Sequence, residues 1–224
     1  WLDKRMLSHT HGQPATPTTM GKEFMVFFYR ISRQLKILDK IKLYTKFGGA
    51  VGNLDAHYKA YPKINWDKQM DLFIENMSLN RSSWTTQVDG NESMIEVFDC
   101  VRRINNILID FCQDTWLYIS NNYFIYKKVD GEVGSSTMPH KINPIDFENA
   151  EGNLYLANQF AEFFARKLPI SRLQRDLTDS TIMRNIGVFW GHSFIAYDAI
   201  IKGINKLELN EKVVKEDLQN NIVV

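Results

Sequence analysis

The sequence is poor in cysteine and has no long apolar run, and both absences exclude classes of protein. Its two cysteines, Cys100 and Cys112, fall within one stretch of helical pattern, where their spacing separates them by roughly 18 Å. A disulfide needs Cα atoms within about 7 Å, so we expect two free thiols in a reducing compartment. No run of about 18 apolar residues could span a membrane, and the first residues lack the apolar core of a signal peptide. We therefore expect a cytoplasmic protein.

A strong charge of one sign is also absent. The 27 lysine and arginine residues almost balance the 26 aspartate and glutamate residues, and the formal net charge is +1. Nucleic acids and acidic membrane surfaces attract clustered positive charge, so neither is an expected partner. With 224 residues, of which 44% are hydrophobic, the chain can bury a core in one large or two small domains. We do not expect disorder.

Convincing strand patterns are missing, whereas helical patterns cover most of the chain. Thr16 and Pro17 suit the N-cap and first position of a long amphipathic helix, and Asn65 and Asn210 suit two further N-caps. Helices this long indicate an all-α, elongated bundle, and their wide apolar faces predict burial against other subunits. We predict helices over 16–44, 66–77, 92–123, 144–168 and 179–207, and another from residue 211.

Two histidines lie two positions apart in the run SHTHGQPATP. An extended backbone would project His9 and His11 to the same side, and histidine is the side chain best suited to proton transfer near neutral pH. Gln13 could orient a substrate amide or carboxylate. A metal pair is the alternative, but no third ligand follows at a recognisable spacing. We expect no metal site.

A loop is predicted over residues 127–143, which end in GSSTMPHKIN. Ser135 and Ser136 supply hydroxyl groups and Lys141 supplies a fixed positive charge. Asn143-Pro144 starts a helix whose free N–H groups attract anions. These groups could bind a carboxylate and stabilise an oxyanion; an ordinary Ser/Gly loop before a capped helix is the alternative.

A second polar cluster occurs in SRLQRDLTDSTIMRN, where Arg172, Arg175 and Arg184 surround Ser180 and Thr181 at the start of a predicted helix. The planar fork of arginine, together with helix N-terminal donors, suits a phosphate or carboxylate clamp. A solvated loop with surface salt bridges is the alternative.

The run GSSTMPHKINP resembles the signature of the fumarase/aspartase superfamily. Within that superfamily, THGQPATPTTMGKE, GAVGN, TTQ, DFENAEGN and SRLQRDLTDSTIMRN are together similar to the adenylosuccinate lyase family, in its bacterial-type branch. The resemblance extends from about Met6 to Leu209. It implies a central helical domain over 1–209, the start of a C-terminal helical region over 210–224, and a homotetramer whose active sites are shared between subunits.

The resemblance also implies a reaction that needs no cofactor. This is the reversible elimination of fumarate from adenylosuccinate to leave AMP, with a parallel cleavage of the succinylated aminoimidazole carboxamide ribotide (SAICAR to AICAR) in purine biosynthesis. By this resemblance Ser135 is the general base that removes the Cβ proton, and His11 is the general acid that protonates the departing nitrogen. Lys141 then helps to hold the doubly charged carboxylate of the carbanion. The other matched positions, which would bind substrate, are Thr10, Gln13, Gln87, Ser136, Met138, Asn143, Asn149, Arg175, Ser180 and Arg184.

Two departures from the family pattern affect these expectations. His9 occupies a position where the family more often has arginine, so a contact of that arginine would be absent or replaced. The chain also begins just before the histidine motif and ends within a predicted helix. We therefore expect a fragment that lacks the family's N-terminal domain and is inactive alone.

Other readings of the same residues remain open. Argininosuccinate lyase, fumarase and the carboxymuconate-cycloisomerising branch share the architecture, and a phosphate site at Arg175 and Arg184 would separate a nucleotide substrate from a small diacid. A noncatalytic scaffold is the alternative from another functional class. The intact set of Ser135, His11 and Lys141 argues against a scaffold.

Overall fold

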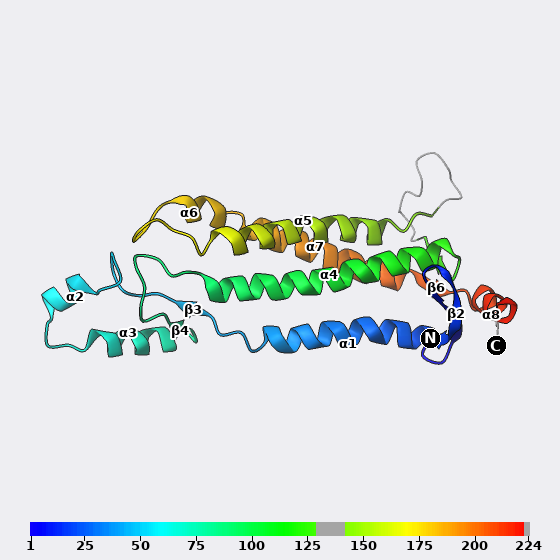
Figure 1. The fold of residues 1–224 in the computed structure, drawn as a ribbon, viewed down its shortest axis with the longest axis horizontal. Coiled ribbons are helices and arrows are strands. Elements are labelled where there is room, and N and C mark those ends of the chain that lie inside the picture. Colours follow the sequence, from blue (N-terminus) through cyan, green and yellow to red (C-terminus); the bar gives the residue numbers. More distant parts are fainter. Residues whose placement is uncertain (129–141, 222–224) are drawn as a thin grey trace. The chain divides into compact units, whose positions relative to one another are not determined.

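The computed structural model of the chain describes residues 1–128 and 142–221 (Figure 1). Helices make up most of it, which confirms the predicted helical class. The chain divides into two compact units: the first comprises Trp1–Arg33, Ile104–Leu156 and Gly191–Val224, and the second comprises Gln34–Arg103 and Ala157–Trp190. In chain order the elements are β1 (Arg5–Thr10), β2 (Gln13–Thr19), α1 (Met20–Leu38), β3 (Tyr44–Thr45), α2 (Asp55–Ala60), α3 (Trp66–Glu75), β4 (Asn80–Arg81), α4 (Glu92–Ser120), β5 (Phe124–Tyr126), α5 (Ile145–Lys167), α6 (Thr178–Met183), α7 (Ile186–Asn205), β6 (Leu207–Leu209) and α8 (Glu211–Asn220).

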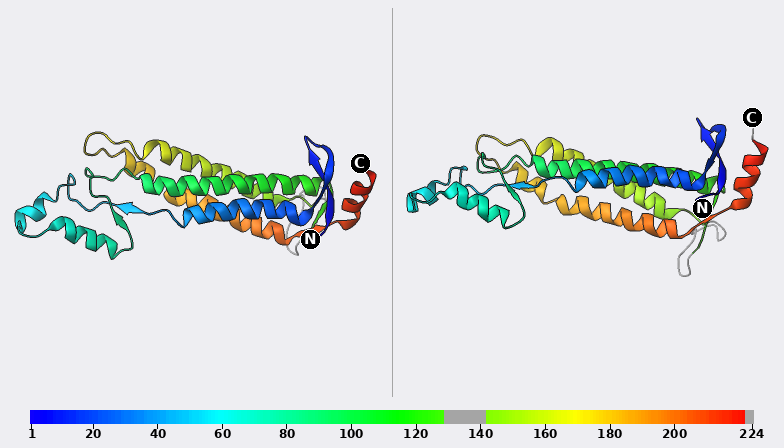
Figure 2. Two further views of the ribbon diagram at one scale, coloured as in Figure 1. Left: turned by 60° about the horizontal axis from the view of Figure 1, so that its bottom comes forward. Right: turned by 90° about the horizontal axis from the view of Figure 1, so that it is seen from below.

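The first unit packs parts of α1, α4, α5 and α7 around one core (Figures 1 and 2). The antiparallel pair β5–β6 closes one end of that core and buries Phe124 and Tyr126. Phe147, in the first turn of α5, is also buried there and lies 6.2 Å from Phe111 and 6.0 Å from Tyr126, measured between ring centroids. The start of α5 is thereby fixed against α4 and β5.

The second unit has its own core, made by other parts of α4, α5 and α7. Phe98 of α4 is buried with its ring 5.1 Å from both Phe164 of α5 and Phe189 of α7. Aromatic rings at this spacing contribute beyond the area that they bury. This core supports the segment before α4 and the loop after α5, which carry the polar residues of the unit.

The prediction of a helix from Thr16 is wrong, because residues 13–19 form strand β2. Pro14 and Pro17 cannot donate backbone hydrogen bonds, and the β-branched threonines between and after them favour extended backbone. The N-cap of α1 is instead Thr19, whose hydroxyl accepts a hydrogen bond from the Lys22 amide at 3.2 Å. The expectation that the chain lacks strands is therefore also wrong.

The structure confirms several of the other helix predictions. Asn65 and Asn210 are N-caps as predicted, and their side chains accept hydrogen bonds from the amides of Lys68 and Val213. The helix predicted over 92–123 is α4, which ends at Ser120. The helix predicted over 179–207 is interrupted after Met183, so that α6 and α7 are separate.

The predicted free cysteines are confirmed. Cys100 and Cys112 both lie on α4, are buried and form no disulfide. Burial and the nearby charge of Glu151 raise the pKa of the Cys112 thiol to about 12. A thiol with so high a pKa is protonated and unreactive at neutral pH.

Several apolar side chains on the long helices remain uncovered in this chain. On α1, Phe28 and Tyr29 are each 63% exposed, although both belong to a long helix with a buried side. On α7, Phe194 and Ile195 are likewise exposed. Within residues 1–128 and 142–221, no helix is both long and apolar enough to cross a membrane.

Candidate active site

The histidine motif forms the tip of the β1–β2 hairpin in the first unit. His9 pairs with Pro14 and Thr10 pairs with Gln13, so His11 and Gly12 are the two residues of the turn. Their φ angles are 55° and 72°, the positive values that a type I′ turn requires at both central positions. The hairpin thus brings Thr10, His11 and Gln13 together at one exposed tip.

His11 adopts a left-handed backbone conformation, which is uncommon for residues other than glycine. Such conformations cost free energy and occur often at functional sites. The prediction that an extended backbone projects His9 and His11 to one side is wrong, because only His9 lies in the strand. His11 lies in the turn and is exposed to solvent.

His9 has a partner of its own. Its Nε2 lies 3.9 Å from the Asp217 carboxylate of α8, and the Tyr123 hydroxyl donates a hydrogen bond to the same carboxylate. The His9 and Tyr123 rings are 6.4 Å apart. His9 therefore faces an acidic group of α8.

A directional chain of hydrogen bonds orients Asn149, in the second turn of α5. The Asn153 amide nitrogen donates to the backbone carbonyl and to the side-chain Oδ1 of Asn149, both at 2.8 Å. A backbone carbonyl can only accept a hydrogen bond, so the atom of the Asn153 side chain beside it is the amide nitrogen. The amide oxygen of Asn153 then faces His192 Nδ1, 2.8 Å away. His192 Nδ1 must then carry a proton. The side-chain oxygen of Asn149 is engaged, and its NH₂ group is the donor that it can present to a ligand.

A second set of candidate residues meets in the second unit. Arg175 Nη1 donates a hydrogen bond to the side-chain Oε1 of Gln87 at 3.4 Å. The backbone N–H of Gln87 donates to the backbone carbonyl of Gln174 at 3.2 Å. Lys46 Nζ donates to the carbonyl oxygens of Gln87 and Gly49, at 2.6 and 2.7 Å. In the part of the chain that the structure describes, no carboxylate forms an ion pair with Lys46 or Arg175. The two cations thus gather around Gln87 without a neutralising group.

The pKa of Lys46 reflects this environment. Burial and, to a smaller extent, the positive charge of Arg175 lower the pKa of the Lys46 ammonium below its ordinary value. An anion bound between the two cations would relieve their repulsion. The cluster is therefore suited to a phosphate or carboxylate.

The segment GAVGN packs closely against the segment TTQ, which carries Gln87. Gly52, in GAVGN, has a φ of 87°, and a Cβ atom there would lie 2.1 Å from the Thr85 carbonyl oxygen of TTQ. No side chain fits at this contact. The motif GAVGN thus fixes the segment that carries Gln87.

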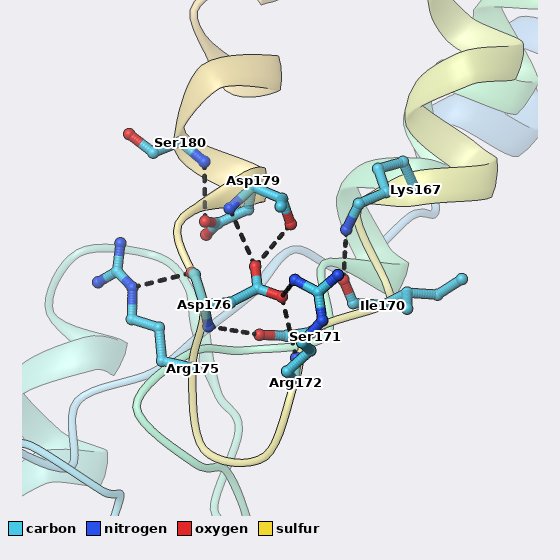
Figure 3. Close-up of polar contacts among 9 residues, drawn as sticks. Lys167, Ile170, Ser171, Arg172, Arg175, Asp176, Asp179 and Ser180 are labelled. Atoms are coloured by element: carbon cyan, nitrogen blue, oxygen red, sulfur yellow. Dashed lines mark hydrogen bonds and ion pairs between the residues drawn. The ribbon is translucent and has the colours of Figure 1, made fainter.

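The loop that carries Arg175 is organised by a single carboxylate (Figure 3). Asp176 accepts hydrogen bonds from the amide and hydroxyl of Thr178, at 2.9 and 2.6 Å, and from the amide and guanidinium of Arg172, each at 3.2 Å. The hydrogen bonds from Thr178 are the main reason that the pKa of Asp176 falls to about 2. Arg172 is neutralised by this carboxylate, whereas Arg175 does not pair with it: its Nε donates to the backbone carbonyl of Asp176, at 3.4 Å.

The predicted helix start near Ser180 is less open to an anion than the sequence suggested. Helix α6 has six residues. The Thr178 amide is taken by Asp176, and the Ser180 amide is taken by the Asp179 carboxylate at 2.8 Å. Ser180 is half-buried, and Arg184 is exposed at the end of α6.

The described candidates are divided between the two units, and a side-chain hydrogen bond joins two of them, Gln87 and Arg175. Thr10, His11 and Gln13 share the hairpin tip, while Asn143 and Asn149 flank the start of α5. In the second unit Gln87 contacts Arg175 directly, and Ser180 and Arg184 follow on α6 and at its end. Four candidates, Ser135, Ser136, Met138 and Lys141, lie outside the described residues.

Some polar residues of these sets carry no signal in the sequence. Lys46 is a lone lysine in TKFGG, and only the fold brings it to Gln87. His192 belongs to a helix far from Asn149 in the chain, and the histidines are scattered when read as a sequence. Across residues 1–128 and 142–221, no cluster of three or more histidine, cysteine, aspartate or glutamate side chains could hold a metal ion.

Comparison with known proteins gives the family. A lyase family model matches residues 3–157, and an adenylosuccinate lyase C-terminal model matches residues 171–224. The adenylosuccinate lyase of Escherichia coli K12 is 49% identical over 221 residues, which cover 99% of this chain and 48% of that protein. The adenylosuccinate lyase of Dictyostelium discoideum is 52% identical over 227 residues, covering 100% of this chain and 49% of that protein. The chain spans about half the length of these curated relatives.

A solved structure shares the fold. The crystal structure described as fumarate lyase:delta crystallin from Brucella melitensis, bound to cobalt, has a TM-score of 0.76 and covers 99% of this chain and 50% of that one. Its sequence identity is 18%, so this likeness concerns the fold alone. The sequence matches, by contrast, extend over the hairpin, the Gln87 segment and the arginine loop. The chain belongs to the lyase family of the fumarase/aspartase superfamily, and within it to the group typified by the adenylosuccinate lyases.

Proposed function

We propose that the protein containing this chain eliminates fumarate from adenylosuccinate to leave AMP, and from SAICAR to leave AICAR. The observation that carries the proposal is the identity of 49–52% with adenylosuccinate lyases over essentially the whole chain. Two features of the structure support it. They are the exposed histidine at the hairpin tip and the unneutralised cations around Gln87.

The proposed general acid is His11, and the proposed general base is Ser135. Ser135 removes the Cβ proton of the succinyl group, and His11 protonates the nitrogen that departs. A turn held on both sides by strand pairing gives the His11 ring a fixed origin while leaving its nitrogen atoms open to a substrate. Thr10 and Gln13, on either side of the turn, would contact the substrate beside the departing nitrogen.

The carbanion formed by proton removal carries a doubly charged carboxylate, which needs cations and N–H donors around it. We assign this role to Lys141, Ser136 and Asn143, with Met138 beside them. Asn149 would add the NH₂ group that its hydrogen bond from Asn153 leaves pointing outward. This step needs no cofactor.

The nucleotide end would be held by the second set. Arg175 is the cation that the loop leaves unpaired, and Gln87 receives a hydrogen bond from it. Lys46 adds a second positive charge beside Gln87. With Ser180 on α6 and Arg184 at its end, these groups suit the phosphate of a nucleotide better than a small diacid.

We further propose that the chain acts within a homotetramer that completes each site from several subunits. The uncovered apolar residues of α1 and α7, such as Phe28 and Phe194, support such an assembly. So does Trp84, which is 98% exposed beside the Gln87 segment. Residues 1–209 would form the central domain and residues 210–224 the start of a C-terminal region. The two free thiols suit the reducing cytoplasm.

Fumarate release by the full-length protein tests the proposal. The wild type and its Ser135→Ala variant are each supplied with adenylosuccinate, and their oligomeric state is measured in parallel. We expect wild-type turnover and a loss of several orders of magnitude in the variant. A variant that keeps more than about a tenth of the turnover would show that Ser135 is not the base. A folded tetrameric wild type that releases no fumarate would refute the substrate assignment and favour a sister lyase.

A further inference from the structure

A buried ionic network lies at the two ends of the segment that carries Ser135 and Lys141. It joins Tyr126, the last residue of β5, to Asp146 in the first turn of α5, and includes Lys206, which precedes β6. The Tyr126 hydroxyl donates to Asp146 Oδ2. Lys206 Nζ lies 2.6 Å from the same oxygen and 5.6 Å from the centre of the Tyr126 ring.

The three side chains are withdrawn from solvent. The Lys206 side chain is 6% exposed and that of Asp146 is 14% exposed, and Tyr126 is buried. Removing such charges from water carries a large desolvation penalty, and a well-packed apolar pair in the same place is often as stable or more so. Stability alone therefore does not explain the ion pair, whereas a need to fix geometry does.

The surrounding contacts make the network a rigid reference point. The Lys127 amide donates to the Lys206 carbonyl at 2.9 Å, and Tyr126 pairs with Leu207 across the β5–β6 ladder. The neighbouring Phe147 fills the space left by Gly203 of α7, where a Cβ atom would lie 2.8 Å from the phenylalanine ring. The backbone is thus held both where it leaves β5 and where it enters α5.

We propose that the Tyr126–Asp146–Lys206 network is a positioning device for the proposed reaction. One carboxylate ties the residue before the segment 127–145 to the residue after it, and Lys206 neutralises that carboxylate. The network thereby fixes the two anchor points of the segment that carries Ser135 and Lys141. The inference rests on the proposed function of those two residues, and it assigns the network itself no contact with substrate.

Steady-state kinetics of the full-length protein with adenylosuccinate test the inference. Tyr126→Phe removes only the hydroxyl that links the two ends. The double variant Asp146→Leu/Lys206→Met removes both buried charges together, so that neither is left unpaired. Glu208→Gln is the matched control, because Glu208 lies on β6 and forms an exposed ion pair with Lys127 at 2.5 Å.

We expect kcat to fall by about 10- to 100-fold in Tyr126→Phe and in the double variant, since misplacing reacting groups by about 1 Å has effects of this size. KM should change less than about threefold, because binding depends also on Gln87 and Arg175, which lie outside the network. Hydrogen exchange at the Lys127 and Phe147 amides should speed up in both variants. The Glu208→Gln control should match the wild type in every measurement.

The outcomes separate the inference from the function on which it rests. A folded double variant with kcat within twofold of wild type would overturn the positioning role while leaving the proposed function intact. A Tyr126→Phe variant with unchanged kcat and unchanged exchange at both amides would overturn it too, even if the double variant failed to fold. A wild type without turnover would refute the proposed function, and the inference would fall with it.

Discussion

The hairpin tip of the first unit and the arginine loop of the second each present a proposed substrate-binding side chain, but different forces hold them. At the tip, paired strands fix His11 from both sides through the backbone. In the loop, one side chain, Asp176, gathers the donors that give the loop its shape. A backbone ladder tolerates most side-chain changes, whereas a loop built on one carboxylate depends on that residue and on its ionisation.

The comparison also shows how each region keeps its functional group available. The hairpin places His11 in a left-handed conformation at the turn, outside the paired residues of the two strands. In the loop, the Asp176 carboxylate pairs with Arg172, and Arg175 donates its hydrogen bonds to the Asp176 backbone carbonyl and the Gln87 side-chain amide. Among the residues that the structure describes, no carboxylate neutralises the exposed functional group of either region.

Replacing His11 should have the largest effect. Asparagine tolerates positive φ better than most residues, so His11→Asn should preserve the turn and the melting temperature while removing the proposed acid. We expect kcat to fall by about 10²- to 10⁴-fold, as measured by fumarate release from adenylosuccinate in the full-length protein. Equal loss of activity and of thermal stability would instead assign His11 a structural role at the turn.

Two arginines three positions apart should then behave differently. Arg175→Ala should raise KM for adenylosuccinate by about 10- to 100-fold, because it removes a charged hydrogen-bonding group from the proposed phosphate site. Arg172→Ala is the matched control: its guanidinium is 80% exposed and paired with Asp176, so KM should change by less than about threefold. Similar KM values for the two variants would place the nucleotide elsewhere.

The hydrogen bonds to Asn149 should contribute less. His192→Phe removes the donor that fixes the Asn153 amide, so Asn149 loses its preferred orientation. We expect kcat to fall about twofold to tenfold, the effect of one hydrogen bond. His192→Gln, whose amide can also donate, should restore most of the activity. If both variants are as active as the wild type, Asn149 needs no such orientation.

The smallest effect concerns the titration of Asp176. The pKa of Asp176 in the folded protein is about 2, below its ordinary value of 3.8. The ionised carboxylate therefore stabilises the loop fully at pH values above about 3.8, and this stabilisation is lost as the pH falls through about 2. A carbon-detected NMR titration should show a midpoint near 2 in the wild type. Thr178→Val, which removes the hydroxyl donor, should shift the midpoint toward 3.8, whereas an unshifted midpoint would show that the hydroxyl does not lower the pKa.

Local signals in the sequence predicted most of the helices. Asn65 and Asn210 were predicted as caps because their side chains can satisfy the first amides of a helix, and both do so. The hairpin was missed because Thr16-Pro17 also fits a helix start. Residues 13–19 form a strand because they pair with residues 5–10, and such pairing cannot be predicted from the residues of one short segment.

The candidate site was predictable where short motifs carry it and not where the fold assembles it. His11, Gln87 and Arg175 stand out through the runs that contain them. Lys46 reaches Gln87 through the folding of two distant segments against each other, which also packs Gly52 against Thr85. The Tyr126–Asp146–Lys206 network likewise unites residues from three separate parts of the chain.

The central claim is that this lyase acts on a succinylated nucleotide, and a substrate comparison tests it most directly. Fumarate release by the full-length protein would be measured with adenylosuccinate, argininosuccinate and malate at equal concentrations. The account predicts turnover of adenylosuccinate and a kcat/KM that is higher for it than for either other substrate by at least about 10³-fold, because only this substrate offers a phosphate to Arg175 and its neighbours. Comparable or faster turnover of argininosuccinate or malate would contradict it.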